Sequence, residues 1–335
     1  MTETLTAEPS TRSELATAVE LLGQSTATAR LKEMVRRAAA IEGGTLLTGE
    51  PGVDLDAVAA HLHARSRNAA GSYITVDCDA TDPTQVDQAL FGVIDADAPP
   101  DLESVSADSR IAAARGGTLF LRHVGELPAA VQARLARVAR DGEVRVDGVP
   151  VATAWRLVAS AQPTIDADVR AHRFRSDLFR RLSAVRIDLP PLRERPDDVS
   201  AIATRLVEES CLARGMAPMA FSPSALSLVA SIPWPGNVAE LRAALDRIVE
   251  SNEDETIEIE QVLPALQLHR AAAAPFVPAP SLREARLRFE REYIAAVLQH
   301  HGWRMADAAQ TLGIQRPNLY RKARQLGIPL TRISE

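Results

Sequence analysis

The amino-acid sequence predicts an α/β protein with a parallel sheet, followed by helical segments. Short apolar runs alternate with helical patterns between residues 23 and 190, which is typical of βαβ units. Residues 191–269 have mainly helical patterns, and the C-terminal end has two short helical patterns joined by a glycine. We therefore expect an αβα core, a small helical subdomain and a separate all-α C-terminal domain.

Five short apolar runs are the expected strands of the sheet. They are Thr45–Thr48, Tyr73–Val76, Thr118–Leu121, Trp155–Ala159 and Val185–Leu189. A helical pattern near 26–40 precedes the first of them, and helical patterns near 56–67 and 128–140 lie between later ones. Parallel strands need a crossover of this length, so the alternation favours a parallel sheet.

Beyond residue 191 the expected elements are helices. Residues 191–269 form a small helical domain with a Pro-Gly turn at Pro233–Asn237, and AAAAPFVPAP at 271–280 reads as a linker. An amphipathic helix at 283–300 follows, with an apolar residue at every fourth position from Ala285 to Val297. Two short helices near 304–312 and 316–326 meet at Leu312-Gly313-Ile314, the pattern of a helix-turn-helix.

Composition excludes several classes of protein. The 335 residues are 46% hydrophobic and 24% charged, which is globular, and no run approaches 18 apolar residues, so we expect no membrane span. The N-terminus has no basic and apolar signal for secretion. Cys78 and Cys211 have no second cysteine or histidine at metal spacing, so we expect two buried thiols of a cytoplasmic protein and no metal site.

The charge is unevenly distributed along the chain. The net charge is −6, but residues 281–335 hold 10 Lys and Arg against 5 Asp and Glu. Residues 1–280 hold 28 against 39. A basic module on an acidic body indicates a nucleic-acid contact at the C-terminal end.

Several stretches carry a resemblance to a known family. They are Gly116–Leu121 with Gly125–Pro128, Phe174–Leu182, Leu189–Arg195, Trp234–Val238 with Glu240–Arg242, and Leu312–Ile314 with Leu319–Lys322. From about residue 21 to 329 the chain resembles the bacterial enhancer-binding proteins, the sigma-54-dependent activators. The resemblance implies a leader at 1–22, an AAA+ α/β subdomain at 23–190, a helical lid at 191–269, a linker at 270–281 and a Fis-type helix-turn-helix domain at 282–330.

The phosphate-binding loop departs from the family pattern GESGTGKE. This chain has GEPGVDLD from Gly49, so Leu55 stands where the family has its phosphate-binding lysine. Asp54 replaces a glycine and adds a negative charge, and Pro51 removes a backbone donor. Gly49 and Gly52 persist, so we expect a turn without its nucleotide.

The hydrolytic residues of the family are replaced as well. Arg122 and His123 align with the acidic pair that holds Mg²⁺ and polarises water. Ala161 aligns with the sensing asparagine and Ala239 with the second sensor arginine. The resemblance implies ATP and Mg²⁺ as cofactors, but these substitutions predict a pseudo-ATPase with no catalytic residues and no cofactor.

The contact with sigma-54 also differs from the family. A loop bearing GAFTGA follows Phe91-Gly92 in the family, whereas Val93–Ser104 here is acidic and has neither glycine nor aromatic residue. We do not expect this loop to contact the sigma-54 polymerase in the same way, and an acidic docking surface remains an alternative.

Two arginines match the arginine-finger positions of the family. Arg175 and Arg181 act there on nucleotide bound by the neighbouring subunit. In this chain we expect them to serve an interface of a homodimer or larger homo-oligomer. The alternative is that they are donated to an intact AAA+ relative.

The DNA-binding end keeps the features of its family. Asn318 suits adenine edges, and Arg316 and Arg321 suit guanine or phosphate. Lys322 and Arg324 suit phosphates. By resemblance, helix 283–300 pairs two modules into a dimer that reads half-sites of double-stranded DNA about one turn apart.

Three functions remain open at this stage. The first is a DNA-binding transcriptional regulator whose AAA+ module is a non-hydrolysing assembly or ligand platform. The second is a working ATP-driven sigma-54 activator, and the third is a subunit that joins and modulates an intact relative.

Overall fold

The structure is a computed structural model that describes residues 21–79, 82–93, 101–252, 254–265 and 316–326, and positions 294, 298, 305 and 309. The chain divides into two units, residues 1–269 and 270–335, which are described separately. The expected linker, most of the expected leader and the apolar stripe of helix 283–300 lie outside the described residues. Within the described part, no helix is long and apolar enough to cross a bilayer.

The first unit contains a five-stranded parallel sheet. Its strands are β1 (Thr45–Thr48), β2 (Tyr73–Asp77), β4 (Thr118–Arg122), β7 (Arg156–Ala161) and β8 (Val185–Asp188). Their order in the sheet is β2-β4-β7-β1-β8, and every pairing is parallel. These are the five strands expected from the sequence. All residues of β1 and β7 are buried, which explains their continuous apolar runs.

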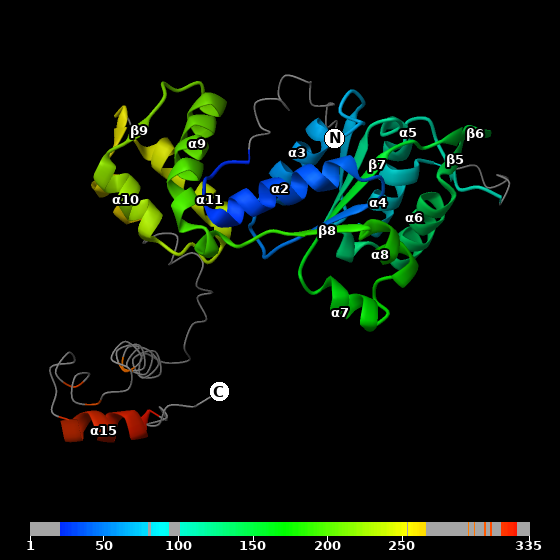
Figure 1. Ribbon diagram of the computed structural model, residues 1–335. Coiled ribbons are helices and arrows are strands. Elements are labelled where there is room, and N and C mark those ends of the chain that lie inside the picture. Colours follow the sequence, from blue (N-terminus) through cyan, green and yellow to red (C-terminus); the bar gives the residue numbers. More distant parts are fainter. Residues whose placement is uncertain are drawn as a thin grey trace. The chain divides into compact units, whose positions relative to one another are not determined.

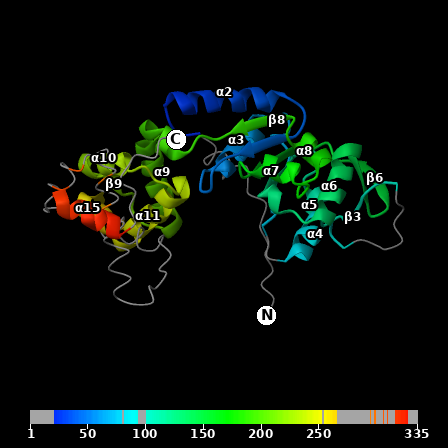
Figure 2. The same ribbon diagram turned by 90° about the horizontal axis from the view of Figure 1, so that it is seen from below.

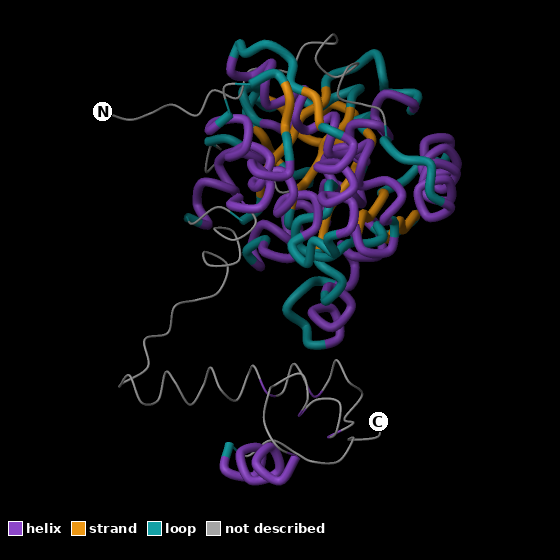
Figure 3. Tube along the Cα trace, turned by 90° about the vertical axis from the view of Figure 1, so that its left-hand side faces the viewer, coloured by secondary structure: helices purple, strands orange, loops and turns teal. Residues whose placement is uncertain are grey.

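Helices cover both faces of the sheet, as Figures 1 and 2 show. One face carries α2 (Thr26–Ala40) and α3 (Leu55–Arg65); the other carries α4 (Pro83–Phe91), α5 (Arg110–Ala113), α6 (Ala129–Asp141) and α8 (Ser176–Leu182), with α7 (Ile165–Arg170) nearby. Successive residues of a strand point to opposite faces, so Leu46 packs in one apolar cluster and Leu47 in the other. Figure 3 shows the strands enclosed by helices on both sides.

A small second sheet was not expected from the sequence. It consists of β3 (Ser104–Val105), β5 (Glu143–Val146) and β6 (Val149–Ala152), in the order β3-β5-β6. The β5–β6 hairpin turns at Asp147-Gly148, where both residues have positive φ angles of 45° and 86°. An Asp-Gly pair between two alternating runs is the sequence signal for such a hairpin.

The helical lid that the sequence predicts follows the sheet within the described residues. Its elements are η2 (Leu192–Glu194), α9 (Pro196–Arg214), β9 (Ala220–Phe221), α10 (Pro223–Ser231), α11 (Asn237–Ser251) and β10 (Thr256–Ile257); η1 (Val124–Glu126) lies earlier, after β4. Trp234 is buried in the apolar core of the lid, where its indole N–H donates to the Val229 carbonyl at 2.9 Å.

The described residues of the second unit are helical except for Leu326, which lies in a turn. Its one helix with described bounds is α15 (Arg316–Gln325). Three pairs of buried apolar residues are each spaced by four positions: Ile294 and Leu298, Met305 and Ala309, and Leu319 and Ala323. Residues four apart share one face of a helix, so each helical segment has an apolar face.

Candidate functional site: the cleft at the strand ends

The expected site residues meet at the carboxyl ends of the strands. Open α/β sheets bind ligands at the point where the strand order reverses, which in this sheet lies between β7 and β1. The loop from Gly49 follows β1, Arg122 ends β4, and Ala161 ends β7. The structure therefore brings these three parts of the expected nucleotide site to one edge of the sheet.

The loop after β1 forms a turn in which two backbone donors are used inside the loop. The Val53 N–H donates to the Glu50 carbonyl at 3.3 Å, and the Leu55 N–H donates to the Val53 carbonyl at 3.0 Å. The Leu55 side chain packs, together with that of Val53, against the apolar cluster between the sheet and α2. The residue at the position of the family lysine thus contributes to the core.

Asp54 is the N-cap of α3. Its carboxylate accepts the backbone N–H of Ala57 at 3.0 Å. Helix N-termini with free N–H groups are the places where proteins bind phosphate, and here a side-chain carboxylate lies at that position. Burial is the main cause that raises the pKa of Asp54, and the charge of Asp56 adds to it.

Arg122 crosses the cleft to form an ion pair. Its Nε donates to the Asp56 carboxylate at 2.8 Å, joining the end of β4 to the first turn of α3. Both side chains are more than a third exposed. By the resemblance, Asp56 keeps the carboxylate that ends the family pattern GESGTGKE, while Arg122 puts a cation where the family has a carboxylate.

His123 has a left-handed backbone conformation, with φ of 51°. Its ring Nδ1 lies 3.1 Å from the Asp77 carboxylate at the end of β2, and its backbone N–H donates to the Ser160 hydroxyl at 3.1 Å. Burial acts to raise the pKa of Asp77, but hydrogen bonds from the Asp79 backbone and His123 outweigh it and lower that pKa. His123 therefore joins three strand ends.

The lid holds the loop through backbone contacts. The Ala239 N–H donates to the Gly52 carbonyl at 3.0 Å, and the Asn237 side-chain amide donates to the Pro51 carbonyl at 2.9 Å. Gly52 has a φ of 83°, and a Cβ atom added there would lie 2.2 Å from the Gly236 carbonyl oxygen. Close approach of the lid thus accounts for the retained glycine.

A bidentate ion pair reinforces these contacts. Arg193 donates from both terminal nitrogens to the Glu50 carboxylate, each at 2.6 Å. We call this pair, with the contacts of Asn237 and Ala239 to the loop, the lid latch. The sequence does not predict the latch, because partners 143 and 186 positions apart share no local pattern.

The candidate DNA-binding residues lie on α15. Arg316, Asn318, Arg321 and Arg324 are exposed and Lys322 is half-buried, while Leu319 and Ala323 are fully buried. Arg321 donates to the Asn318 side-chain oxygen at 3.1 Å. The helix presents a polar, basic face opposite its apolar one, as a recognition helix requires.

Comparison with known proteins decides the family. The family model described as the Sigma-54 interaction domain matches residues 21–188. The chain belongs to the sigma-54 interaction domain family. The AAA+ ATPase lid domain matches residues 193–276 of this sigma-54 family chain, and the Fis family of bacterial regulatory proteins matches residues 286–326.

Relatives of this sigma-54 family chain are transcription regulators. It is 36% identical to the nitric oxide reductase transcription regulator NorR1 of Cupriavidus necator, over 92% of this chain and 64% of that protein. It is 33% identical to the anaerobic nitric oxide reductase transcription regulator NorR of an Enterobacter species, over 92% of this chain and 63% of that protein. The chain thus spans less than two thirds of these relatives.

A solved structure supports the same fold. NtrX from Brucella abortus, determined in complex with ATP, has a TM-score of 0.63 and 28% identity, covering 92% of this chain and 70% of that one. By the resemblance, the cleft of this chain lacks two groups of the family's nucleotide site. Leu55 and Arg122 stand where the family has a lysine and a carboxylate, and the Asp54 carboxylate caps the helix at the phosphate position.

The two arginine-finger positions lie on or beside α8 and are exposed. Arg175 makes a bidentate ion pair with Asp177 of the same chain, at 3.0 and 2.7 Å. Arg181 donates to the Ala139 carbonyl at 3.2 Å. Arg175 is therefore paired within the single chain, and Arg181 makes a polar contact there.

Proposed function

We propose that this chain is a sequence-specific DNA-binding transcriptional regulator whose AAA+ module does not hydrolyse ATP and serves as an assembly or ligand platform. The ion pair between Arg122 and Asp56 is the observation that carries the proposal. It sets a cation at the strand end, where a hydrolysing member needs a carboxylate for Mg²⁺. Membership of a regulator family and the basic face of α15 support the DNA-binding part.

The charges of the cleft oppose a magnesium triphosphate. Losing the charge-assisted hydrogen bond of the lysine costs about 1.5–3 kcal/mol, and the Asp54 carboxylate repels the phosphates. At about 1.4 kcal/mol for each factor of ten, these effects weaken triphosphate binding by roughly a hundredfold or more. The lid latch occupies the two loop carbonyls and holds the lid against the loop without nucleotide.

Calorimetric titration with Mg-ATP, together with a phosphate-release assay, tests this proposal. We expect no saturable binding with a Kd below about 1 mM and no hydrolysis above the buffer blank. The matched control is a restored variant that carries Asp54→Gly, Leu55→Lys, Arg122→Asp and His123→Glu. It should bind Mg-ATP about a hundredfold more tightly, because lysine and carboxylates return to their family positions.

Two results would distinguish this function from the two alternatives, an ATP-driven sigma-54 activator and a modulatory subunit. A micromolar Kd for Mg-ATP in the wild type, with hydrolysis that Arg122→Ala abolishes, would establish a working ATP-driven activator instead. Stimulation of an intact relative's ATPase by the wild-type chain would favour the modulatory subunit. The loop expected to replace the sigma-54 contact lies mostly outside the described residues, so we base no role on it.

A further inference from the structure

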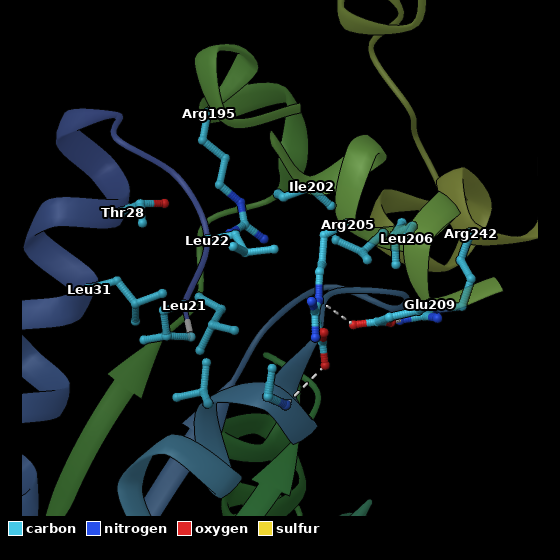
Figure 4. A pocket seen from close by; sticks show the side chains of 15 residues that line it. Leu21, Leu22, Thr28, Leu31, Arg195, Ile202, Arg205, Leu206, Glu209 and Arg242 are labelled. Carbon is cyan, nitrogen blue, oxygen red and sulfur yellow. Dashed lines mark hydrogen bonds and ion pairs between the residues drawn. The ribbon is translucent and has the colours of Figure 1, made fainter. Parts of the chain in front are cut away.

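A cavity of about 150 Å³ lies between α2, α3 and the lid helices α9 and α11. Its walls combine apolar side chains, among them Leu21, Leu22, Leu31, Ile202 and Leu206, with charged ones. Figure 4 shows Leu21, Leu22 and Leu31 on one side of it and Ile202 and Leu206 on the other. The cavity is bounded by the sheet unit's helices and the lid together, so anything bound in it would contact both.

One buried cation projects into this cavity. Arg195 is 6% exposed, and its Nε atom has no hydrogen-bond partner among the described residues. In Figure 4 its side chain runs from the lid towards Leu22 and the centre of the cavity. Burial is the main cause that lowers the pKa of Arg195. A buried guanidinium without a paired anion is costly, so the site favours an added anion.

The nearby acidic groups are already occupied. The Asp198 carboxylate accepts hydrogen bonds from the backbone and side chains of the segment before α2 and its first turn. Asp54 caps α3 through the Ala57 N–H. Among the described residues neither makes an ion pair with Arg195 within 4.0 Å. Asp198 and Asp54 therefore act on Arg195 only through longer-range charge, and the Arg195 Nε–H is left for a ligand.

The other two arginines of the cavity have acidic partners. Arg205 donates to Glu209 at 3.1 Å, and Arg242 donates to the same carboxylate at 3.1 Å. Figure 4 shows Arg205, Glu209 and Arg242 together at one end of the cavity. Among the arginines that line the cavity, Arg195 is therefore the one without an ion pair to a described acidic side chain, and it is the group that can bind an anion.

We propose that this cavity binds a small apolar monocarboxylate, with the carboxylate on the Arg195 guanidinium and the apolar body between the leucines. A planar guanidinium suits a carboxylate because it can donate two parallel hydrogen bonds. A cavity of this volume holds about one six-membered ring. A single unpaired cation matches a single negative charge. The ligand joins α2 to α9 and so stabilises the lid against the sheet.

This proposal goes beyond the proposed function and rests on it in one respect, that Mg-ATP does not fill the cleft. A nucleotide base is the competing occupant of an apolar cavity beside a phosphate loop. The two are distinguishable because a base needs no anionic group at Arg195, whereas a monocarboxylate does.

Thermal unfolding and calorimetry of the full chain with defined probes test the site. The probes are benzoate and hexanoate, their neutral analogues benzamide and hexanamide, and AMP. We expect at least one acid to bind saturably and to raise the Tm by several degrees at about 100 times its Kd. The matching amide should bind at least about tenfold more weakly, because it lacks the charge.

Three variants assign the binding to this cavity. Arg195→Met should weaken binding of the acid by about 10- to 100-fold. Ala57→Leu, which fills part of the cavity and leaves Arg195 in place, should also weaken it. Arg214→Met, on the same lid helix but paired with Glu250 outside the cavity, should leave the Kd unchanged.

Several results would overturn the proposal. They are the absence of binding by both acids at 10 mM, equal binding of an acid and its amide, or equal affinity in wild type and Ala57→Leu. Saturable AMP binding without carboxylate binding would assign the cavity to a nucleotide base. Tight Mg-ATP binding in the earlier titration would overturn the proposed function and leave the benzoate and hexanoate results to decide this site separately.

Discussion

Asp198 shows how one side chain joins the lid to the sheet unit. It is fully buried in the first turn of α9 and accepts four hydrogen bonds, from the Gln24 and Ser25 backbone and the Ser25 and Thr28 hydroxyls, at 2.6–2.8 Å. Burial acts to raise the pKa of Asp198, but the hydrogen bonds from Ser25, Thr28 and Gln24 outweigh it and lower that pKa. The charge is therefore stabilised in the folded state.

Replacing this carboxylate should destabilise the fold. Asp198→Ala leaves four donors without their acceptor, so we expect a loss of about 3 kcal/mol and a Tm lower by about 6–12 °C. The control is Asp197→Ala, which removes an exposed carboxylate of the same helix turn and should cost no more than about 1 kcal/mol. Equal Tm values for the two variants in differential scanning calorimetry would contradict this account.

The same residue predicts a dependence on pH. Because the folded pKa lies below the unfolded value of about 3.9, the stabilisation is complete above that pH and is lost as the pH falls through the folded value. The wild type and Asp198→Ala should therefore differ in free energy of unfolding by a constant amount from pH 5 to 7. This difference should become smaller below about pH 4. Denaturant titrations at several pH values measure the difference.

At the scale of one element, α15 combines two faces with different tasks. Its buried face holds Leu319 and Ala323, which position the helix, and its exposed face carries Asn318 and Arg321. The hydrogen bond between Arg321 and Asn318 sets the two side chains next to each other. Neighbouring side chains that share a contact do not act additively.

Variants of α15 should separate base contacts from phosphate contacts. Asn318→Ala and Arg321→Ala should each weaken binding to the operator by about 1–3 kcal/mol, and the double variant by less than the sum. Arg324→Ala should weaken binding to all duplex sequences alike and reduce the slope of log affinity against log salt by about one. Fluorescence anisotropy with operator and scrambled DNA distinguishes these effects. Unchanged operator affinity in both Asn318→Ala and Arg321→Ala would place recognition elsewhere.

At the scale of the whole molecule, the surface around α8 bears on how subunits associate. Arg175 and Arg181 lie exposed near α8, and their contacts with Asp177 and the Ala139 carbonyl are at the surface. Asp177 can exchange its partner for one across a subunit boundary, because the pair is about half exposed on both sides. We propose that these arginines now stabilise an interface between subunits.

Sedimentation velocity tests the interface. The double variant Arg175→Ala/Arg181→Ala should self-associate more weakly, by up to about fivefold for each arginine, since exposed ion pairs contribute 0–1 kcal/mol. Higher salt should reduce the difference from wild type. Arg180→Ala, an exposed arginine of the same helix, is the control. The double variant could instead self-associate normally, while the wild type but not the variant stimulates an intact relative's ATPase. That result would establish that Arg175 and Arg181 act as arginine fingers in the nucleotide site of the relative.

Local pattern was sufficient to predict most of the core. The five expected strands are the five strands of the parallel sheet, each end within two residues, because buried parallel strands are continuous apolar runs. The β5–β6 hairpin also has a local sequence signal, the Asp-Gly pair at Asp147-Gly148. The family motifs predicted the AAA+ module, its lid and the Fis-type domain, which the comparisons confirm.

The sequence by itself determined which chemical groups the cleft contains, above all leucine and arginine in place of lysine and carboxylate. Only the tertiary structure decided what those groups do with one another. Arg122 meets Asp56 across 66 positions, and Asn237 meets Pro51 across 186. Arg195 looks like an ordinary charged residue in the sequence, and only the packing of α2 against α9 buries it. Periodicity records which face of an element is apolar, but it contains no information on which distant side chain will be its partner.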